Sequence, residues 1–500
     1  MADPRINLRK HFPQPEAIRL VAENMARRYN AIPVTLSGNT LTVAMADPTD
    51  IFALEALATS TGKRIEPQAA TADEILEAID FNYRSYAEIE KQLSAMSTGE
   101  GEDDSPIKLT TLNDAPVSQA LVLIIDEAVK ARASDIHLQP QEDKLRVRYR
   151  IDGTLHEALT LPLATAVPLI SRIKVLANMN IADHNRPQDG QFSVEAKGRS
   201  IDIRVGTTPT VHGEMAAMRL LYKARATMTL PELGFSSESL VVYEKMLKVP
   251  YGMILVSGPT GAGKTTTLYA SINCLDSVGR NIITIEDPVE YRFKNINQIQ
   301  VNTKSGMTFA SGLRSILRLD PNVILVGEIR DAETANIAVQ SALTGHLVLS
   351  SIHANDAIGV IFRLLDLGVE PFLVASSLAG IVAQRMVRRI CPECSRPVRV
   401  SVLEQMIYAK ESGDERNEFL YGAGCHSCSQ TGYLGRMGIF EILRMTDELR
   451  TLVIKGSTAA EIRTETLKEG TVTLLRDGMQ KVKDNFTTPT EVLRNAYTEE

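Results

Sequence analysis

The chain has 500 residues, with 54 Lys or Arg against 61 Asp or Glu, so its formal net charge is −7. Apolar residues make up 44% and charged residues 23%, which is typical of a folded globular protein and excludes a chain that is disordered throughout. The mild acidity argues against bulk binding of nucleic acid, which needs a basic face. At about 150 residues per domain, this length suggests about three domains.

No apolar run reaches the ~20 residues needed to span a bilayer, and the first residues lack the apolar stretch of a secretory signal. We therefore expect a cytosolic chain. The five cysteines are too few for a disulfide scaffold, and four of them form two Cys-x-x-Cys pairs.

Residues 1–92 predict a small α/β domain. Apolar residues at helical spacing precede two short alternating runs, Val34–Leu36 and Leu41–Val43, and the Gly-containing stretch between these runs is typical of a β-hairpin. Residues 93–106 are polar and acidic and contain Gly and Pro, which favours a flexible linker; a long surface loop is the alternative.

Residues 107–223 predict a second α/β domain, which begins with an amphipathic helix from Val117 to Ala131. In a following strand, three arginines alternate with apolar residues and therefore share one face: Arg146, Arg148 and Arg150. A later strand points Arg204 away from its apolar face. Such a row of cations indicates that a phosphate or an acidic surface meets this face, although a solvated face is an equal alternative.

The strongest signal is a complete G-x-x-x-x-G-K-T P-loop between a short apolar strand and a helical pattern. It consists of Gly258, Pro259, Thr260, Gly261, Ala262, Gly263, Lys264 and Thr265, followed by Thr266. The glycines let backbone N–H groups close on phosphate oxygens, and the helix N-terminus adds a favourable dipole. We expect Lys264 to reach the β- and γ-phosphates of ATP and Thr265 to bind Mg²⁺.

Two apolar strands beyond the P-loop end in acidic residues. Because ligands of a parallel sheet bind outside the carboxyl ends of its strands, these acids are candidates for the hydrolytic site. Glu328 occupies a Walker-B position, with Gly327 where many P-loop ATPases place the metal-binding Asp. We expect Glu328 to serve the Mg²⁺ and water shell and to activate water. Glu286 is a second candidate for polarising water, and capping of strand ends is the alternative for both acids.

Five basic residues around this region are candidates for contacts with the γ-phosphate: Arg314, Arg318, Arg330, His346 and His353. Arg314 and Arg318 share one face of a predicted helix, and the two histidines flank an apolar strand. Known arginine fingers accelerate hydrolysis by about 10³–10⁵. The alternatives are ordinary ion pairs for the arginines and structural roles for the histidines.

Four cysteines form two Cys-x-x-Cys knuckles: Cys391, Cys394, Cys425 and Cys428. The four thiolates can bind one tetrahedral Zn²⁺ as a closed structural site. The gap between the knuckles exceeds the usual zinc-ribbon spacing and contains a predicted helix from Val402 to Ala409. The fifth cysteine, Cys274, is expected to be a small core residue.

Together these motifs resemble the secretion ATPases of type II secretion and type IV pilus assembly. Beside the P-loop, four segments look like the family's Asp box, atypical Walker B, His box and tetracysteine insertion: residues 285–290, 326–331, 344–356 and 391–428. Four upstream motifs are similar to those of the family's second domain: residues 133–137, 150–153, 186–190 and 212–214. The resemblance of residues 1–92 to the family's N-terminal domain is weaker.

The resemblance implies a multidomain α/β protein. A RecA-like P-loop NTPase domain, residues 224–500, would include a tetracysteine zinc module at 391–436 and follow two smaller α/β domains, the second of them PAS-like. The family forms homo-hexamers that hydrolyse ATP, and its second domain would supply Arg204 and Arg219 to a nucleotide site. Hydrolysis would drive assembly of a pseudopilus or pilus through an inner-membrane platform.

The type II secretion branch is favoured, because its members are near this length and carry one N-terminal domain; a pilus-extension ATPase is the alternative. Residues 1–92 would bind a bitopic inner-membrane partner, and a polytopic platform protein would be a second partner. The chain would thus reach the cytoplasmic face of the inner membrane only through partners. Some relatives bind cyclic-di-GMP through N-terminal motifs that begin Arg-Leu-Gly. Residues 1–30 contain no such motif, so we do not predict this ligand.

Two hypotheses from other classes compete with this one. A nucleic-acid motor would need a basic path bearing aromatic residues, whereas this chain is acidic and contains no Trp. A static nucleotide-dependent scaffold would bind ATP without turnover.

Overall fold

The computed structural model describes residues 6, 8, 13, 15–18, 20–76, 78–79, 116–196, 199–222, 228–275 and 277–496. The predicted linker at 93–106 lies outside these residues. The chain divides into two compact units, each a mixture of helices and strands as predicted. The first comprises Met1–Tyr222, Cys391–Ser395 and Gly422–Leu434, and the second comprises Lys223–Ile390, Arg396–Tyr421 and Gly435–Glu500. The module expected at 391–436 is thus divided between the two units.

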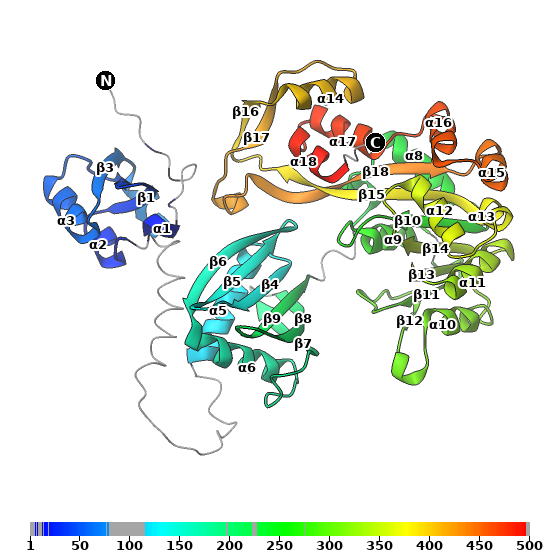
Figure 1. Ribbon diagram of the computed structural model, residues 1–500, viewed down its shortest axis with the longest axis horizontal. Coiled ribbons are helices and arrows are strands. Elements are labelled where there is room, and N and C mark those ends of the chain that lie inside the picture. Colours follow the sequence, from blue (N-terminus) through cyan, green and yellow to red (C-terminus); the bar gives the residue numbers. More distant parts are fainter. Residues whose placement is uncertain are drawn as a thin grey trace. The chain divides into compact units, whose positions relative to one another are not determined.

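A three-stranded sheet of order β1-β2-β3 lies near the N-terminus of the first unit (Figure 1). Its strands are β1 (Ala31–Ser37), β2 (Thr40–Met45) and β3 (Arg64–Ala69). The antiparallel pairing of β1 with β2 confirms the predicted hairpin, while β2 and β3 pair in parallel. Its helices are α1 (Pro15–Ile18), α2 (Glu23–Arg28) and α3 (Ile51–Thr61), and the core includes Leu41, Val43 and Leu57.

The first unit also contains a six-stranded antiparallel sheet of order β6-β5-β4-β9-β8-β7. Its strands are β4 (Asp135–Pro140), β5 (Lys144–Ile151), β6 (Thr154–Pro162), β7 (Gln188–Ala196), β8 (Arg199–Thr210) and β9 (Gly213–Tyr222). Helices α5 (Pro116–Lys130) and α6 (Ala166–Leu176) share one core with its apolar residues. Along β5 the odd-numbered apolar residues are buried and the three predicted arginines alternate with them, which confirms the period-two prediction.

The second unit is built on a seven-stranded sheet of order β12-β11-β13-β14-β10-β15-β18 (Figure 1). The strands are β10 (Gly252–Ser257), β11 (Ile282–Glu286), β12 (Asn297–Gln300), β13 (Val323–Ile329), β14 (Leu347–Ile352), β15 (Leu378–Ile390) and β18 (Tyr433–Arg444). Neighbouring strands from β12 to β15 are parallel. A separate two-stranded sheet joins β16 (Ser395–Arg399) and β17 (Glu418–Gly422).

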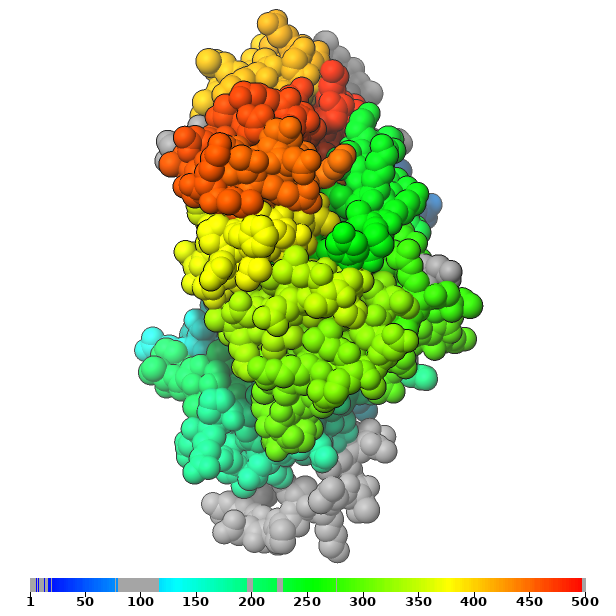
Figure 2. All heavy atoms as spheres, turned by 90° about the vertical axis from the view of Figure 1, so that its right-hand side faces the viewer, coloured from blue at the N-terminus to red at the C-terminus, as the bar shows by residue number. Residues whose placement is uncertain are grey.

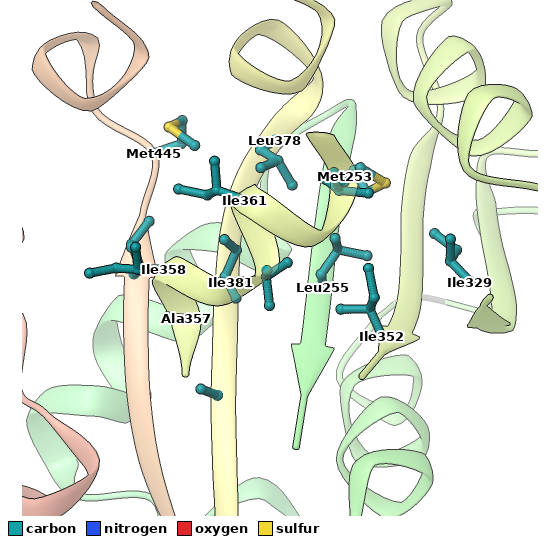
Figure 3. Close-up of a cluster of buried hydrophobic side chains, with 14 of the residues drawn as sticks. Met253, Leu255, Ile329, Ile352, Ala357, Ile358, Ile361, Leu378, Ile381 and Met445 are labelled. Carbon is teal, nitrogen blue, oxygen red and sulfur yellow. The ribbon is translucent and has the colours of Figure 1, made fainter. Parts of the chain in front are cut away.

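Strands β10, β11 and β14 are buried along their whole length, which shows that both faces of the sheet are covered. This unit also contains a set of helices. They are α7 (Leu230–Leu233), α8 (Ser237–Leu247), α9 (Lys264–Asn273), α10 (Phe309–Ile316), α11 (Ala332–Leu343), α12 (Ala357–Asp366), α13 (Pro371–Ser377), α14 (Val402–Ser412), α15 (Asp447–Ile454), α16 (Ala459–Lys468), α17 (Leu474–Lys483) and α18 (Pro489–Ala496). Figure 3 shows Ile358 and Ile361 of α12 in one buried cluster with Leu255 of β10 and Ile381 of β15.

The C-terminal helices complete this unit. Helix α14, which confirms the helix predicted between the cysteine pairs, contacts α17 and α18. Helices α15 and α16 contact α13 and α12, and Figure 2 shows their orange surface continuing into the yellow surface of that segment. None of the helices in the described parts of the chain is long and apolar enough to cross a membrane.

A buried ion pair attaches α18 to β15. The guanidinium of Arg388 donates from Nε and Nη2 to the carboxylate of Glu491 at 3.0 and 2.7 Å. The two side chains are only 16% and 5% exposed. A bidentate pair of this kind has little solvent to replace a missing partner.

Replacing Glu491 by Leu should therefore lower the free energy of unfolding of the second unit by about 3–5 kcal/mol, because Arg388 would stay buried without its partner. Urea unfolding of the purified full chain measures this change. The double variant Arg388→Met/Glu491→Leu removes both charges and should be less destabilised than Glu491→Leu alone. A larger loss in the double variant would contradict this explanation.

Candidate functional site

The P-loop follows β10 directly and leads into α9, whose first residue is Lys264. This confirms the predicted sequence of strand, loop and helix. The ammonium of Lys264 donates to the backbone oxygens of Gly258 and Pro259 at 2.8 and 3.1 Å. Burial lowers the pKa of Lys264, while nearby Glu328 opposes that shift. Thr265 lies in the exposed first turn of the helix.

Close packing under the P-loop explains its first glycine. Gly258 has φ +148°, and a Cβ there would lie 2.5 Å from the backbone oxygen of Gln384 in β15. The buried amide of Gln384 also accepts from Thr267 of α9 at 2.8 Å and donates to the backbone oxygen of Ala262. Gln384 of β15 thus packs against the P-loop and bonds it. No local sequence motif predicted this contact.

Glu328 lies on β13, two places from β10 in the sheet. The register of β13 against β14 shifts between Val326 and Ile329. Ser350 and Ser351 of β14 donate to the backbone oxygens of Val326 and Gly327, both at 2.7 Å, and so bond carbonyls at the irregularity. The two serines therefore stabilise the part of the strand that carries Glu328.

Gly327 lies unusually close to the neighbouring strand β11. A Cβ at this position would lie 3.3 Å from the Cα of Glu286 and 3.4 Å from the ring of Phe309. Even the first atom of an aspartate side chain would therefore crowd these neighbours. This contact gives a physical reason for glycine where many P-loop ATPases place a metal-binding aspartate.

Glu328 is the centre of a charged cluster. One of its carboxylate oxygens lies 2.6 Å from Nη2 of Arg330, and the other lies 3.7 Å from Nε2 of His353, which follows β14. The hydrogen bond with Glu328 raises the pKa of Arg330. Burial, followed by the charge of Lys264, lowers the pKa of His353, which favours its neutral imidazole. The structure therefore brings Lys264, Glu328, Arg330 and His353 to one edge of the sheet.

Glu286 is placed differently from Glu328. It is the last residue of β11, only 3% exposed, and its carboxylate accepts from Thr284 at 2.6 Å and from Gln298 at 3.1 Å. Tyr269 of α9 donates a third hydrogen bond to it. The side chain is thus part of a buried network.

The other predicted arginines of this unit lie outside the cluster. Arg314 pairs with Glu333 in the first turn of α11 at 2.6 Å. Arg318 donates to the backbone oxygen of Arg314, just beyond the end of α10. The next residue, Leu319, accepts from Asn281, which precedes β11, so this corner lies toward the amino ends of the strands.

His346 lies at the opposite end of β14 from His353. Its Nδ1 lies 2.9 Å from the backbone oxygen of Ser341, and its own backbone oxygen accepts from Gly252 at the start of β10. The six residues of β14 separate the two histidines by about 20 Å. Strand direction therefore puts His346 at the amino edge, away from Lys264 and Glu328, and its predicted contact with a phosphate stays a prediction.

Arg204 and Arg219 lie in the first unit, directly opposite each other on β8 and β9. Arg219 donates to the buried carboxylate of Asp135 at 2.9 Å, and Arg150 lies 3.4 Å from the same carboxylate. Arg148 lies on the same strand as Arg150. Burial and the neighbouring Arg146 lower the pKa of Arg148. This sheet therefore presents a strongly cationic face.

The four predicted metal ligands come together. Their sulfur atoms all lie within 4.8 Å of one another, with 3.7 Å between those of Cys391 and Cys425 and 3.9 Å between those of Cys394 and Cys428. Tetrahedral Zn–S bonds of about 2.3 Å would place sulfurs about 3.8 Å apart, so the arrangement fits a metal. Burial raises the pKa of Cys391 to about 11, so metal binding would have to displace its proton.

Sequence analysis did not identify Gln384, Tyr269 or Arg385. Arg385 follows Gln384 at the P-loop and donates to the backbone oxygen of Asn355, two residues before α12 begins. No motif singled out these residues, since their importance comes from contacts between distant parts of the chain.

Comparison with known families places this geometry in context. Residues 110–494 match the family model described as "Type II/IV secretion system protein", and residues 4–87 match the MshEN domain. The chain is 42% identical to the type IV pilus assembly ATPase PilB of Myxococcus xanthus, over 98% of this chain and 88% of that protein. It is 41% identical to the type II secretion system protein E of Xanthomonas campestris, over 94% and 83%. The corresponding protein of Pseudomonas aeruginosa is 47% identical over 76% of each chain.

Solved structures agree on the fold. The Legionella pneumophila ATPase DotB has a TM-score of 0.56 at 19% identity and covers 78% of this chain and 96% of its own. The pilus retraction motor PilT, solved with bound ADP, has a TM-score of 0.51 at 26% identity and covers 75% and 96%. With the P-loop, the acidic strand ends and the match over residues 110–494, these likenesses show that the chain belongs to the type II/IV secretion system protein family of ATPases.

Proposed function

We propose that this chain is a cytoplasmic, homo-hexameric ATPase that powers pseudopilus assembly and protein export through a type II secretion system. The observation that carries the proposal is the cluster of Lys264, Glu328 and Arg330 at the carboxyl ends of two parallel strands, β10 and β13, of one sheet. Identities of 45–47% to type II secretion proteins, over 76–78% of this chain, favour this branch.

The residues at this edge suit phosphoryl transfer to water. Backbone N–H groups of the P-loop would bind the phosphates, and Lys264 would exchange its two carbonyl acceptors for phosphate oxygens. Thr265 would hold Mg²⁺, which neutralises phosphate charge when bound. Glu328 is fixed by Arg330 on one oxygen, which leaves the other oxygen, on the side of His353, to orient the attacking water.

A second candidate function is extension of a type IV pilus. The match to the PilB protein of Myxococcus xanthus favours it, because that match extends over almost the whole chain, including its N-terminal domain. The two functions share the same chemistry and differ in the machine that receives the motion. Residues 1–92 would bind the bitopic inner-membrane partner of this machine, a role that the largely exposed Ile51 and Phe52 at the start of α3 support. The polytopic platform protein would be the second partner.

We further propose that Arg204 and Arg219 act on a nucleotide site completed by packing between subunits of the hexamer. Asp135 supports this role for Arg219, because it fixes one end of a guanidinium that is still 65% exposed. The four cysteines would hold one Zn²⁺ as a structural staple, and no chemistry is assigned to it.

In the source organism, a chromosomal Glu328→Gln variant should stop export of type II secretion substrates while surface pili remain, and should lower phosphate release in vitro by at least about 100-fold. Glutamine keeps the shape but loses the charge that orients water. Immunoblots of culture medium and electron microscopy of pili distinguish the two functions. Loss of pili with intact export would instead establish the second function, and unchanged phosphate release would refute a role of Glu328 in turnover.

Mixing two inactive variants tests the shared site. Lys264→Ala destroys its own P-loop and Arg204→Gln removes the donated cation, so mixed rings should regain ATPase activity at interfaces that combine an intact P-loop with an intact arginine. Each variant alone should be about 100-fold or more below wild type. Lys130→Gln, an exposed change on α5, is the control and should be fully active. No recovery on mixing would show that Arg204 does not act across subunits.

Replacing Cys391 and Cys394 by Ser should remove about one zinc ion per chain and lower the melting temperature of the module, because metal binding supplies folding energy there. Inductively coupled plasma mass spectrometry and thermal unfolding measure both effects. Cys274 is exposed, so the expectation of a core residue was wrong, and Cys274→Ser is a control that should keep its zinc. Purified wild-type protein without zinc would refute the metal assignment.

A further inference from the structure

The helix that leaves the P-loop carries a buried tyrosine, which is joined to the acidic loop after β11. Tyr269 lies on α9 and is 2% exposed. Its hydroxyl donates to the carboxylate of Glu286 and accepts from the backbone N–H of Glu290 at 3.3 Å. A phenol has one proton to donate and lone pairs that accept. One hydroxyl can therefore bond both Glu286, which precedes this loop, and Glu290 within it.

The ring of Tyr269 contacts the same loop. It meets the ring of Tyr291 edge-on, with centroids 6.1 Å apart, and that of Phe293 at 5.0 Å and an interplanar angle of 89°. These are favourable edge-to-face arrangements. The loop from 287 to 293 is therefore attached to α9 through both the hydroxyl and the ring.

Glu286 is committed to this network. It accepts three hydrogen bonds, from Tyr269, Thr284 and Gln298, and is almost completely buried. A carboxylate used in this way is well suited to fix its donors and poorly suited to move toward a water molecule. Gln298 extends the network by donating also to the backbone oxygen of Tyr291 at 2.9 Å.

The loop held by Tyr269 begins beside the strand that carries Glu328. Glu286, directly before this loop, packs beside the strand of Glu328, since a Cβ on Gly327 would lie only 3.3 Å from the Cα of Glu286. Arg330 lies 2.6 Å from the carboxylate of Glu328. The hydroxyl of Tyr269 is thus bonded to a residue whose backbone packs against Gly327, the residue before Glu328 in β13.

We propose that Tyr269 is a positioning residue for ATP hydrolysis: through Glu286 it ties the P-loop helix to the loop 287–293. In this arrangement Glu286 serves as the buried acceptor of Tyr269 and does not polarise the attacking water. The inference concerns the ATPase reaction itself and holds for either secretion machine.

The test is Tyr269→Phe in the full chain, which keeps the ring contacts and removes only the hydroxyl. The value of kcat for ATP should fall by about 10- to 100-fold, because small displacements of a catalytic loop cost this much. The KM for ATP and the Kd of a fluorescent ADP analogue should stay within about twofold of wild type, since the P-loop is unchanged. The double variant Tyr269→Phe/Glu286→Gln should be no slower than Glu286→Gln alone, because both residues act through one contact.

Tyr243→Phe is a matched control. Tyr243 is equally buried, and its hydroxyl bonds Ser271 of the same helix at 2.7 Å, in a cluster on the other side of α9 from the acidic loop's network. The Tyr243→Phe variant should lose about as much thermal stability as Tyr269→Phe, and its kcat should equal that of wild type. A merely structural effect of a missing hydroxyl would appear equally in both variants.

Three results would overturn the proposal: a kcat for Tyr269→Phe equal to that of Tyr243→Phe, a raised KM with unchanged kcat, or rate losses that multiply in the double variant. Should Tyr269→Phe not fold, Gln298→Leu at the half-buried edge strand removes another member of the same network. It should likewise lower kcat without changing the Kd of the ADP analogue, and an unchanged kcat there would refute the proposal.

Discussion

The parallel direction of β10, β11, β13 and β14 is the constraint on which the chemistry of the second unit depends. Parallel strands end at one edge of a sheet, so whatever follows each strand is brought together even when it is distant in sequence. The P-loop, the acidic loop, Glu328 and His353 all follow this rule. Burial of the strands on both faces makes the edge rigid, because neither face can shift without disturbing a helix layer.

Within this edge, two glutamates at equivalent strand ends have different environments. Glu328 retains 15% exposure of its side chain and contacts Arg330 and His353, all beside the P-loop lysine. Glu286 is covered by Tyr269, Thr284 and Gln298. An accessible carboxylate can act on a ligand. A buried carboxylate must be matched by hydrogen-bond donors, and it then holds those donors in place.

Close backbone approach is the second means by which this edge is shaped. Gly258 and Gly327 allow β15 and β11 to come within distances that a side chain would prevent. Serines of β14 then bond the carbonyls at the irregular end of β13. The Walker-B glycine is thus part of the local packing, because a Cβ at this position would lie 3.3–3.4 Å from atoms of β11 and Phe309.

The sequence by itself determined the elements and the chemistry. Apolar runs predicted the strands, the P-loop motif predicted a strand, loop and helix, and paired cysteines predicted a cluster of four sulfur atoms, because these signals are local and periodic. Only the tertiary structure decided which residues meet. Strand direction separated His346 from the site, burial separated the roles of Glu286 and Glu328, and contacts across more than a hundred residues brought Gln384 under the P-loop. These outcomes depend on packing between distant segments, for which local sequence carries no signal.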